Sequence, residues 1–257
     1  MKNYQGYLID LDGTVYLGKE RIPYAREFIN ALNEKGLPHL FVTNNSSKRP
    51  DQVAKKLRDM DIPAETDQVF TTSMATATFL SKKKPDASVY AIGEVGLLDA
   101  LSDHQLELVD EDADFVVIGI DRDVTYEKLA KGCLNINDGA GFISTNADVT
   151  IPTERGFLPG NGSLTSVLEV ATGQKPTFIG KPQAIIMEQA LEKLGLPKEE
   201  TLMVGDNYPT DISAGMNAGL DTLLVLTGVT KREDLKHVEK QPTYVMNHLK
   251  EWLDQMK

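Results

Sequence analysis

The chain has 257 residues, of which 41% are hydrophobic and 25% are charged, as is ordinary for a soluble globular protein. At about 150 residues per domain, this length predicts one large domain or two small ones. Acidic residues outnumber basic residues by 38 to 27, and the net charge of -11 argues against binding of nucleic acid through a basic surface. An anionic substrate must therefore be attracted by local positive charge.

The cysteine content and the apolar pattern predict a cytoplasmic protein. Cys133 is the only cysteine, so an internal disulfide is excluded. A phosphatase of the Cys-x5-Arg type is excluded too, because Gly139 stands where the arginine would be. No apolar run approaches the ~18 residues of a membrane span. The N-terminus lacks the basic and then apolar pattern of a secretory signal, so no membrane partner is expected.

Short apolar runs alternate with helical patterns through the two outer parts of the chain. Strands are expected at residues 7–9, 39–42, 177–179, 202–204 and 222–226, and helices around residues 28–32, 53–60 and 185–194. Alternation of this kind is typical of a parallel sheet with helices on both faces. The sequence therefore predicts an α/β fold with a Rossmann-like core.

The middle of the chain carries a second set of elements between two expected linkers, residues 82–86 and 173–176. Strands are expected at residues 88–92, 114–118 and 141–144, and helices at residues 96–101 and 126–136. We therefore expect an inserted α/β cap domain at residues 81–174. The catalytic core is then expected to consist of residues 1–80 and 175–257.

The strongest local signal is Asp10-Leu11-Asp12-Gly13-Thr14, directly after the first expected strand. Side chains two apart on an extended segment point to the same side, so Asp10 and Asp12 project together from the carboxyl end of this strand. Ligands bind at this end of an open α/β sheet. Two such carboxylates can act as nucleophile and acid, or can hold a hard cation such as Mg2+. The alternative is an ordinary turn, since Asp-Gly is a common turn dipeptide.

Two further expected strands are followed by groups that can bind an anion. Thr43 and Asn44 follow one of them, and their hydroxyl and amide groups can bind a phosphate oxygen. Taken alone, they fit a helix N-cap better than a phosphate site. Lys181 follows another strand and precedes Pro182, which suits the first turn of a helix. This lysine is expected beside a helix N-terminus, which favours an anion, although it can also be a solvated surface residue.

Asp206 and Asp211 form the fourth signal. Asp206 follows an apolar strand, and Thr210 or Asp211 is expected to begin the next helix, whose apolar side carries Ile212 and Met216. One carboxylate at a strand end and one on the first helical turn can converge on a metal. Asp211 can also simply cap the helix.

Together, the four strand ends provide what phosphoryl transfer requires. They contain a nucleophile, an acid, phosphate donors, a cation site and a charge-neutralising lysine. The four histidines have no zinc-site spacing, so the expected cofactor is Mg2+ rather than zinc.

In order and spacing type, these segments resemble the motifs of the haloacid dehalogenase superfamily. The matching residues are Asp10 to Thr14 for the first motif, Thr43 for the second, Lys181 for the third, and Asp206 with Asp211 for the fourth. Residues 12–16, 43–46, 180–182 and 205–207, with 145–146 and 159–163 in the insert, are similar to the NagD/p-nitrophenylphosphatase branch. That branch carries a large α/β cap between its second and third motifs, where this chain has its insert.

The resemblance implies Mg2+-dependent hydrolysis of small phosphate monoesters of the sugar phosphate, nucleotide or p-nitrophenyl phosphate type. Asp10 would attack phosphorus and become a phosphoaspartate. Asp12 would protonate the leaving alkoxide and then deprotonate the hydrolytic water. The cation would be held by Asp10, by the backbone carbonyl of Asp12 and by Asp206, while Asp211 would orient a metal-bound water.

The substrate is expected to be held by residues of both domains. The transferring phosphoryl group is expected to contact Thr43, Asn44, Lys181 and Asn207. In the insert, Thr145, Asn146 and Asp148 follow a strand and are candidates for a loop that determines specificity.

Two other functions use the same residue types. A phosphomutase-like transferase would pass the phosphoryl group to an acceptor other than water. A receiver-like regulatory protein would keep its phosphoaspartate, but receivers are single domains much shorter than this chain. The only expected partner is a small phosphate monoester; the oligomeric state stays open, with a homodimer as one option.

Overall fold

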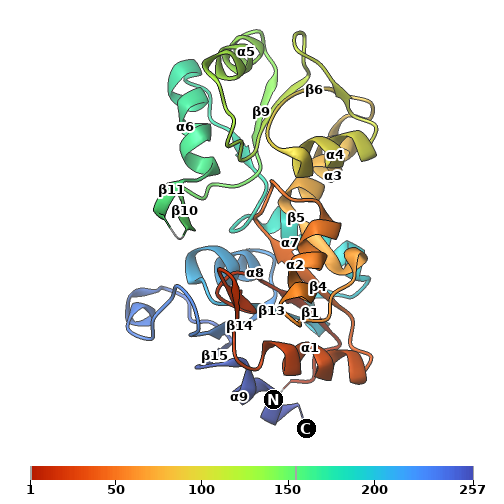
Figure 1. Cartoon of the computed structure of the whole chain (residues 1–257), viewed down its shortest axis with the longest axis vertical. Helices are drawn as coiled ribbons and strands as arrows, with labels where there is room; N and C mark the ends of the chain where they lie inside the picture. Colours follow the sequence, from red (N-terminus) through yellow and green to blue (C-terminus); the bar gives the residue numbers. More distant parts are fainter. Residues whose placement is uncertain (1, 154, 257) are drawn as a thin grey trace. The chain divides into compact units, whose positions relative to one another are not determined.

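The computed structural model describes residues 2–153 and 155–256 and divides the chain into two compact units (Figure 1). The core unit comprises Met1–Thr43, Asp51–Phe70 and Lys181–Lys257, and the insert unit comprises Asn44–Pro50 and Thr71–Gly180. This division groups residues 44–50, 71–80 and 175–180, which were expected in the core, with the insert.

The core unit contains a six-stranded sheet, a short hairpin and flanking helices. Its strands are β1 (Gly6–Ile9), β2 (Tyr16–Leu17), β3 (Glu20–Arg21), β4 (His39–Thr43), β5 (Val69–Thr71), β13 (Thr201–Gly205), β14 (Asp221–Val225) and β15 (Tyr244–Met246). Its α-helices are α1 (Ala25–Glu34), α2 (Pro50–Asp59), α7 (Ala184–Leu194), α8 (Ser213–Asn217) and α9 (Leu249–Gln255). Short 3-10 turns are η1 (Thr66–Gln68), η2 (Lys198–Glu200) and η4 (Asp234–His237), and η3 (Tyr208–Ile212) is a π-helical turn.

Strand β1 lies inside the six-stranded sheet, whose order is β15-β14-β13-β1-β4-β5. It pairs in parallel with β4 on one side and with β13 on the other. The chain therefore builds the sheet outward from β1 in one direction and later in the opposite direction. Ligands bind where the direction of a doubly wound sheet switches, outside the carboxyl ends of its strands. In this sheet that position lies between β1 and β13.

Helices cover both faces of the core sheet. Successive side chains of a strand point to opposite faces, so Tyr7 and Ile9 of β1 join the buried cluster that includes α1, α2 and α9, whereas α7 and α8 contact the strands from the other side. Helices α1 and α9 pack side by side (Figure 1). The predicted Rossmann-like α/β core is confirmed.

The insert unit is a second α/β unit with a five-stranded sheet of order β12-β9-β8-β6-β7. Its strands are β6 (Ser88–Ile92), β7 (Glu107–Leu108), β8 (Phe115–Ile118), β9 (Gly141–Ser144) and β12 (Thr177–Phe178), with a separate hairpin of β10 (Thr150–Thr153) and β11 (Gly156–Pro159). Its helices are α3 (Thr72–Lys83), α4 (Val95–Asp103), α5 (Tyr126–Asn137) and α6 (Asn161–Thr172). All four strand pairs of the sheet are parallel, so the prediction of an inserted α/β unit is confirmed.

The core of the insert unit forms where α5 and α6 pack on one face of its sheet. Ile92 of β6, Ile118 of β8 and Leu168 of α6 are fully buried in one cluster. Helices α5 and α6 contact each other and lie adjacent in Figure 1. Helices α3 and α4 pair with each other, and α4 also contacts β7.

Two expectations about helices are wrong. Helix α3 extends to Lys83, into the segment expected to be a linker. Its buried positions are mostly threonine, serine and alanine, so the sequence shows no apolar stripe there. The helix expected to begin at Thr210 or Asp211 is preceded by η3, which begins at Tyr208.

The core of the insert unit should be sensitive to cavities. Leu168→Ala removes a side chain that is 0% exposed, so we expect the free energy of unfolding to fall by about 2–5 kcal/mol. Val170→Ala, at a position that is 83% exposed on the same helix, should change it by less than about 0.5 kcal/mol. Urea unfolding of both variants measures the difference, and equal losses would contradict the packing described for α6.

Candidate active site

The site begins where β1 and β13 end side by side. The register pairs Ile9 with Val204, so Asp10 and Asp206 emerge next to each other at the carboxyl edge of the sheet. The Asp10 backbone N–H extends this pairing by donating to the Val204 carbonyl at 2.9 Å. Two carboxylates that are far apart in the sequence are thus fixed on adjacent strands.

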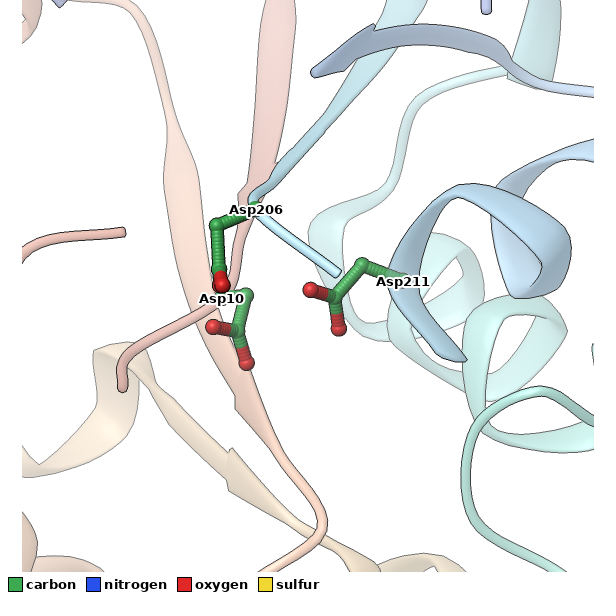
Figure 2. A group of neighbouring side chains, drawn as sticks. All are labelled: Asp10, Asp206 and Asp211. Atoms are coloured by element: carbon green, nitrogen blue, oxygen red, sulfur yellow. The ribbon is translucent and has the colours of Figure 1, made fainter. Parts of the chain in front are cut away.

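A third carboxylate reaches the same point from η3. Oxygen atoms of Asp10, Asp206 and Asp211, one from each residue, all lie within 4.8 Å of one another, and all three residues are buried. Figure 2 shows the three side chains converging, with Asp211 approaching from the helical side. The turn is held in shape because the Asn207 backbone N–H donates to Asp211 Oδ2 at 3.1 Å.

Lys181 supplies the positive charge for this cluster. Its ammonium group lies 2.5 Å from Asp10 Oδ1 and 2.7 Å from Asp211 Oδ1, and it donates to the Val42 carbonyl at 3.1 Å. An ammonium group has three protons, and each of these three contacts can take one of them. The side chain is only 3% exposed, so both ion pairs are shielded from solvent.

Burial and mutual repulsion shift the acid-base equilibria of the cluster. Desolvation, with the neighbouring Asp211 charge, raises the pKa of Asp10, and Lys181 acts in the opposite direction. Desolvation and Asp211 also raise the pKa of Asp206 to about 6. Burial alone would lower the pKa of Lys181, but the Asp10 and Asp211 carboxylates raise it above its ordinary value. Three carboxylates facing one ammonium leave an excess of negative charge.

Thr14 and Gly13 fit tightly around Asp206. The Thr14 hydroxyl lies 3.2 Å from Asp10 Oδ2 and 3.1 Å from Asp206 Oδ1, so it can donate to either carboxylate. Gly13 has a φ of +90°, and a Cβ atom at this position would overlap the Asp206 carboxylate. Only glycine meets both requirements without strain.

Asp12, the predicted acid, lies apart from the buried cluster with an exposed face. Desolvation nevertheless raises the pKa of its carboxyl group, while the charge of Lys56 and a hydrogen bond from the Gly18 backbone act in the opposite direction. Lys56 is itself held over the Tyr16 ring, with Nζ 3.7 Å from the ring centroid. The cluster and Asp12 are therefore two distinct electrostatic environments.

The predicted phosphate-binding residues lie in different surroundings. Thr43 is buried at the end of β4, next to the Val42 carbonyl that Lys181 contacts. The Asn44 side chain belongs to the insert unit and donates to both oxygens of Asp148 at 3.3 and 3.2 Å, so a phosphate oxygen would compete with this carboxylate. Among the described residues, Asn207 Oδ1 is buried without a hydrogen-bond partner. Phosphate binding by these residues stays a prediction.

The predicted specificity loop is a hydrogen-bonded part of the insert unit. Thr145 and Asn146 are buried, and the Asn146 amide donates to the Asn44 carbonyl at 2.9 Å. Asn161 supports them by donating to Thr145 Oγ1 at 3.2 Å and to the Asn146 carbonyl at 2.8 Å. Asp148 is less buried than either residue. Of the three candidates, it has the side chain most accessible to a ligand.

The loop that follows β14 also contributes to the site, and its role was not expected from the sequence. The Val229 backbone N–H donates to Asp206 Oδ2 at 2.7 Å, and the Thr230 backbone N–H donates to the Asp206 carbonyl at 3.2 Å. The only signal was a Thr-Gly pair after an expected strand, which is too common to be diagnostic.

The donor set of the carboxylate cluster fits a hard divalent cation. It consists of carboxylate oxygens only, which Mg2+ prefers, and it includes no histidine or cysteine. Three acidic groups facing Lys181 carry the surplus charge that such an ion would neutralise. The chemistry that this arrangement supports is binding and transfer of an anionic group.

Comparison with known proteins decides the family. The sequence matches the haloacid dehalogenase-like hydrolase family over residues 7–107 and the HAD-hydrolase-like family over residues 178–252. It is 62% identical over 253 residues to the 5'-nucleotidase YutF of Bacillus subtilis (strain 168), covering 98% of this chain and 99% of that protein. The chain belongs to the haloacid dehalogenase-like hydrolases.

Other members of this hydrolase family bear out the predicted branch. The acid sugar phosphatase of Staphylococcus aureus (strain MRSA252) is 55% identical over 98% of this chain and 97% of its own length. A mutant of the thermostable p-nitrophenylphosphatase from Bacillus stearothermophilus has a TM-score of 0.91 at 57% identity, over 98% of this chain and 99% of that one. NagD from E. coli K-12 has a TM-score of 0.91 at 32% identity, over 96% of this chain and 98% of NagD. The resemblance to the NagD/p-nitrophenylphosphatase branch is confirmed.

The helices of this hydrolase do not suit a bilayer. None within residues 2–153 and 155–256 is both long enough and apolar enough to cross a membrane.

The raised pKa of Asp206 predicts a pH-dependent stability in the absence of metal. A free aspartic acid titrates near about pH 3.9, so with a pKa of about 6 the folded protein holds an extra proton between these values. The free energy of unfolding should therefore fall as pH rises through this window. Asp206→Asn should reduce this fall by about 2 kcal/mol, measured by urea unfolding in EDTA between about pH 4 and about pH 7.

Asp138→Asn serves as the control for this measurement because Asp138 is an exposed carboxylate in the insert unit. It should reproduce the wild-type pH dependence. The same pH dependence in wild type and Asp206→Asn would show that the Asp206 carboxyl group is not perturbed.

Proposed function

We propose that this protein is a Mg2+-dependent phosphatase that hydrolyses small phosphate monoesters through a phosphoaspartate on Asp10. The observation that carries the proposal is the buried cluster of Asp10, Asp206 and Asp211 around Lys181, at the switch point of a parallel sheet. Membership of the haloacid dehalogenase-like hydrolases supports it. So do relatives named as a 5'-nucleotidase, an acid sugar phosphatase and a p-nitrophenylphosphatase.

In the first step, Asp10 is the nucleophile. One of its carboxylate oxygens attacks phosphorus, and the bond from phosphorus to the ester oxygen breaks with its electron pair on the leaving group. The attack requires an ionised carboxylate. Lys181, 2.5 Å from Asp10 Oδ1, favours the ionised form against the desolvation that raises the Asp10 pKa.

Asp12 serves as acid and then as base. It gives its proton to the leaving oxygen, and in the second step it takes a proton from the water that attacks the acyl phosphate. Inorganic phosphate leaves, and both carboxyl groups return to their starting states. The raised pKa of Asp12 suits the first of these roles because a carboxyl group must be protonated to act as an acid.

A Mg2+ ion would be held by Asp10, Asp206 and the backbone carbonyl of Asp12, with Asp211 nearby. When bound, the ion supplies charge neutralisation for the phosphoryl oxygens. Lys181 adds a second positive charge, and Thr43, Asn44 and Asn207 are proposed to orient the phosphoryl group. With a chain charge of -11, these local positive charges are what attract an anionic ester.

We further propose that residues 81–174 act as a cap that determines which esters are accepted. The four motif segments lie outside this range, so the core alone has few groups to recognise a leaving group. The insert loop containing Thr145, Asn146 and Asp148 is the proposed reading element, and Asp148 is its most accessible member. The relatives' names span nucleotides and sugar phosphates, which differ only in the leaving group.

Repeated turnover of p-nitrophenyl phosphate with Mg2+ tests the proposed reaction. The wild type should release many equivalents of p-nitrophenol, whereas a receiver-like protein would stop after one. Asp10→Asn should lower kcat by at least about a thousandfold because an amide cannot act as the nucleophile. An Asp10→Asn rate above about one tenth of wild type would rule out the proposed nucleophile. Asp138→Asn, at an exposed carboxylate, is the matched control and should retain the wild-type rate.

The role of the reading loop is tested by Asp148→Asn. We expect the ratio of kcat/KM for a sugar phosphate to kcat/KM for a nucleoside monophosphate to change by about fivefold or more, because specificity depends on leaving-group contacts. The rate with p-nitrophenyl phosphate should change by less than about twofold, since its activated leaving group needs little assistance. Asp138→Asn should leave the substrate ranking unchanged, and an unchanged ranking in Asp148→Asn would remove Asp148 from the reading loop.

A further inference from the structure

The loop of residues 227–230, which follows β14 after Leu226, packs against the Asp206 side chain, although none of its residues belongs to the motifs found in the sequence. The Val229 backbone N–H donates to Asp206 Oδ2 at 2.7 Å. Thr14 approaches the other carboxylate oxygen, Oδ1, at 3.1 Å. Each oxygen thus faces a donor group from a different part of the chain, and these groups restrict the plane of the carboxylate while leaving lone pairs on both oxygens for a cation.

Thr230 connects Asp206 to the turn that carries Asp211. Its backbone N–H donates to the Asp206 carbonyl at 3.2 Å, and its hydroxyl oxygen accepts the Tyr208 backbone N–H at 2.7 Å. Tyr208 begins η3, whose fourth residue is Asp211. Thr230 is only 3% exposed, so these bonds are sheltered from water. One residue therefore links the strand end, through its backbone N–H, to the helical turn, through its hydroxyl group.

Thr227 and Gly228 hold the loop against Gly13 of the first motif. The Thr227 hydroxyl donates to the Gly13 carbonyl at 2.7 Å. A Cβ atom on Gly228 would overlap the Asp206 carboxylate and lie 2.9 Å from the Gly13 Cα atom. The loop therefore packs tightly against the Asp206 carboxylate. This short distance is possible because residue 228 is a glycine, which has no Cβ atom.

We propose that residues 227–230 are a positioning loop that sets the affinity of the Asp10–Asp206–Asp211 cluster for a divalent cation, with Thr230 as the main positioning residue. The inference rests on the proposed function, which places Mg2+ at this cluster. Groups that orient metal ligands through hydrogen bonds contribute to affinity even though they do not touch the ion. Thr230 meets this description for two ligand-bearing segments at once.

Thr230→Val tests the proposal because valine has nearly the shape of threonine but cannot accept the Tyr208 N–H. We expect the dissociation constant for Mn2+, a stand-in for Mg2+ with similar oxygen ligands, to rise by roughly 10–100-fold. Free Mn2+ is measured by electron paramagnetic resonance on the substrate-free protein, and displacement by Mg2+ gives the Mg2+ affinity. At saturating Mg2+, the KM for p-nitrophenyl phosphate should stay within about threefold of wild type.

Two control variants separate positioning from general damage. Thr230→Ser keeps the hydroxyl group and should restore Mn2+ affinity to within about threefold of wild type. Thr177→Val makes the same change at an exposed threonine of β12 and should not alter it. Wild-type Mn2+ affinity in Thr230→Val would overturn the proposal, as would an equal loss in Thr230→Ser.

A second variant decides the matter if Thr230→Val does not fold. Gly228 is outside the positive-φ region, so Gly228→Ala adds a methyl group against Asp206 without backbone strain. We expect it to weaken Mn2+ binding by at least about tenfold, and unchanged binding would overturn the proposal. If the wild type itself binds neither Mn2+ nor Mg2+, the metal-dependent function fails instead, so the two failures are distinguishable.

Discussion

The site depends on the buried contact of Lys181 with Asp10 and Asp211. Three carboxylates gathered away from water repel one another and lose hydration, and an unpaired buried charge is costly. The Lys181 ammonium offsets both penalties because it lies within 2.7 Å of the Asp10 and Asp211 carboxylates. It also donates a hydrogen bond to the Val42 carbonyl. Removing this ammonium would leave the acidic residues without a compensating charge inside the protein. The same ammonium group that offsets the charge of the cluster is also suited to bind the oxygens of an anionic group.

The residues that surround the Asp206 carboxylate are small and lie close to it. Gly13 and Gly228 leave space for the Asp206 carboxylate, and Thr14 and the Val229 backbone bring donors to its two oxygens. Carboxylates that are fixed before a ligand arrives need not reorganise when charge develops on it. The same close packing therefore fixes the orientation of the Asp206 carboxylate and gathers the negative charge of the three acidic residues.

The sequence predicted the parts of the structure that follow from strand order. Asp10 and Asp206 could be expected to meet because both follow apolar strands of one parallel sheet, and such strands present their carboxyl ends at one edge. The ion pair between Lys181 and Asp211 could not be predicted, because it depends on a π-helical turn that hydrophobic spacing does not reveal. Nor could the contact between Asn44 and Asp148, which comes from side-chain packing between segments far apart in the chain. Helix α3 escaped detection because its buried face is made of small and polar residues.

The strand order also has a consequence for biosynthesis. Strand β1 completes its pairing with β13 only after the whole insert has been made, and the Thr14 to Asp206 contact joins residues 192 positions apart. During synthesis on the ribosome, one edge of β1 stays unpaired until β13 has been made. The strands of the insert sheet, from β6 to β12, are by contrast contiguous in sequence. Unpaired strand edges invite association with other chains. The nascent chain therefore acquires the complete carboxylate cluster late in its translation, after β13 has been made.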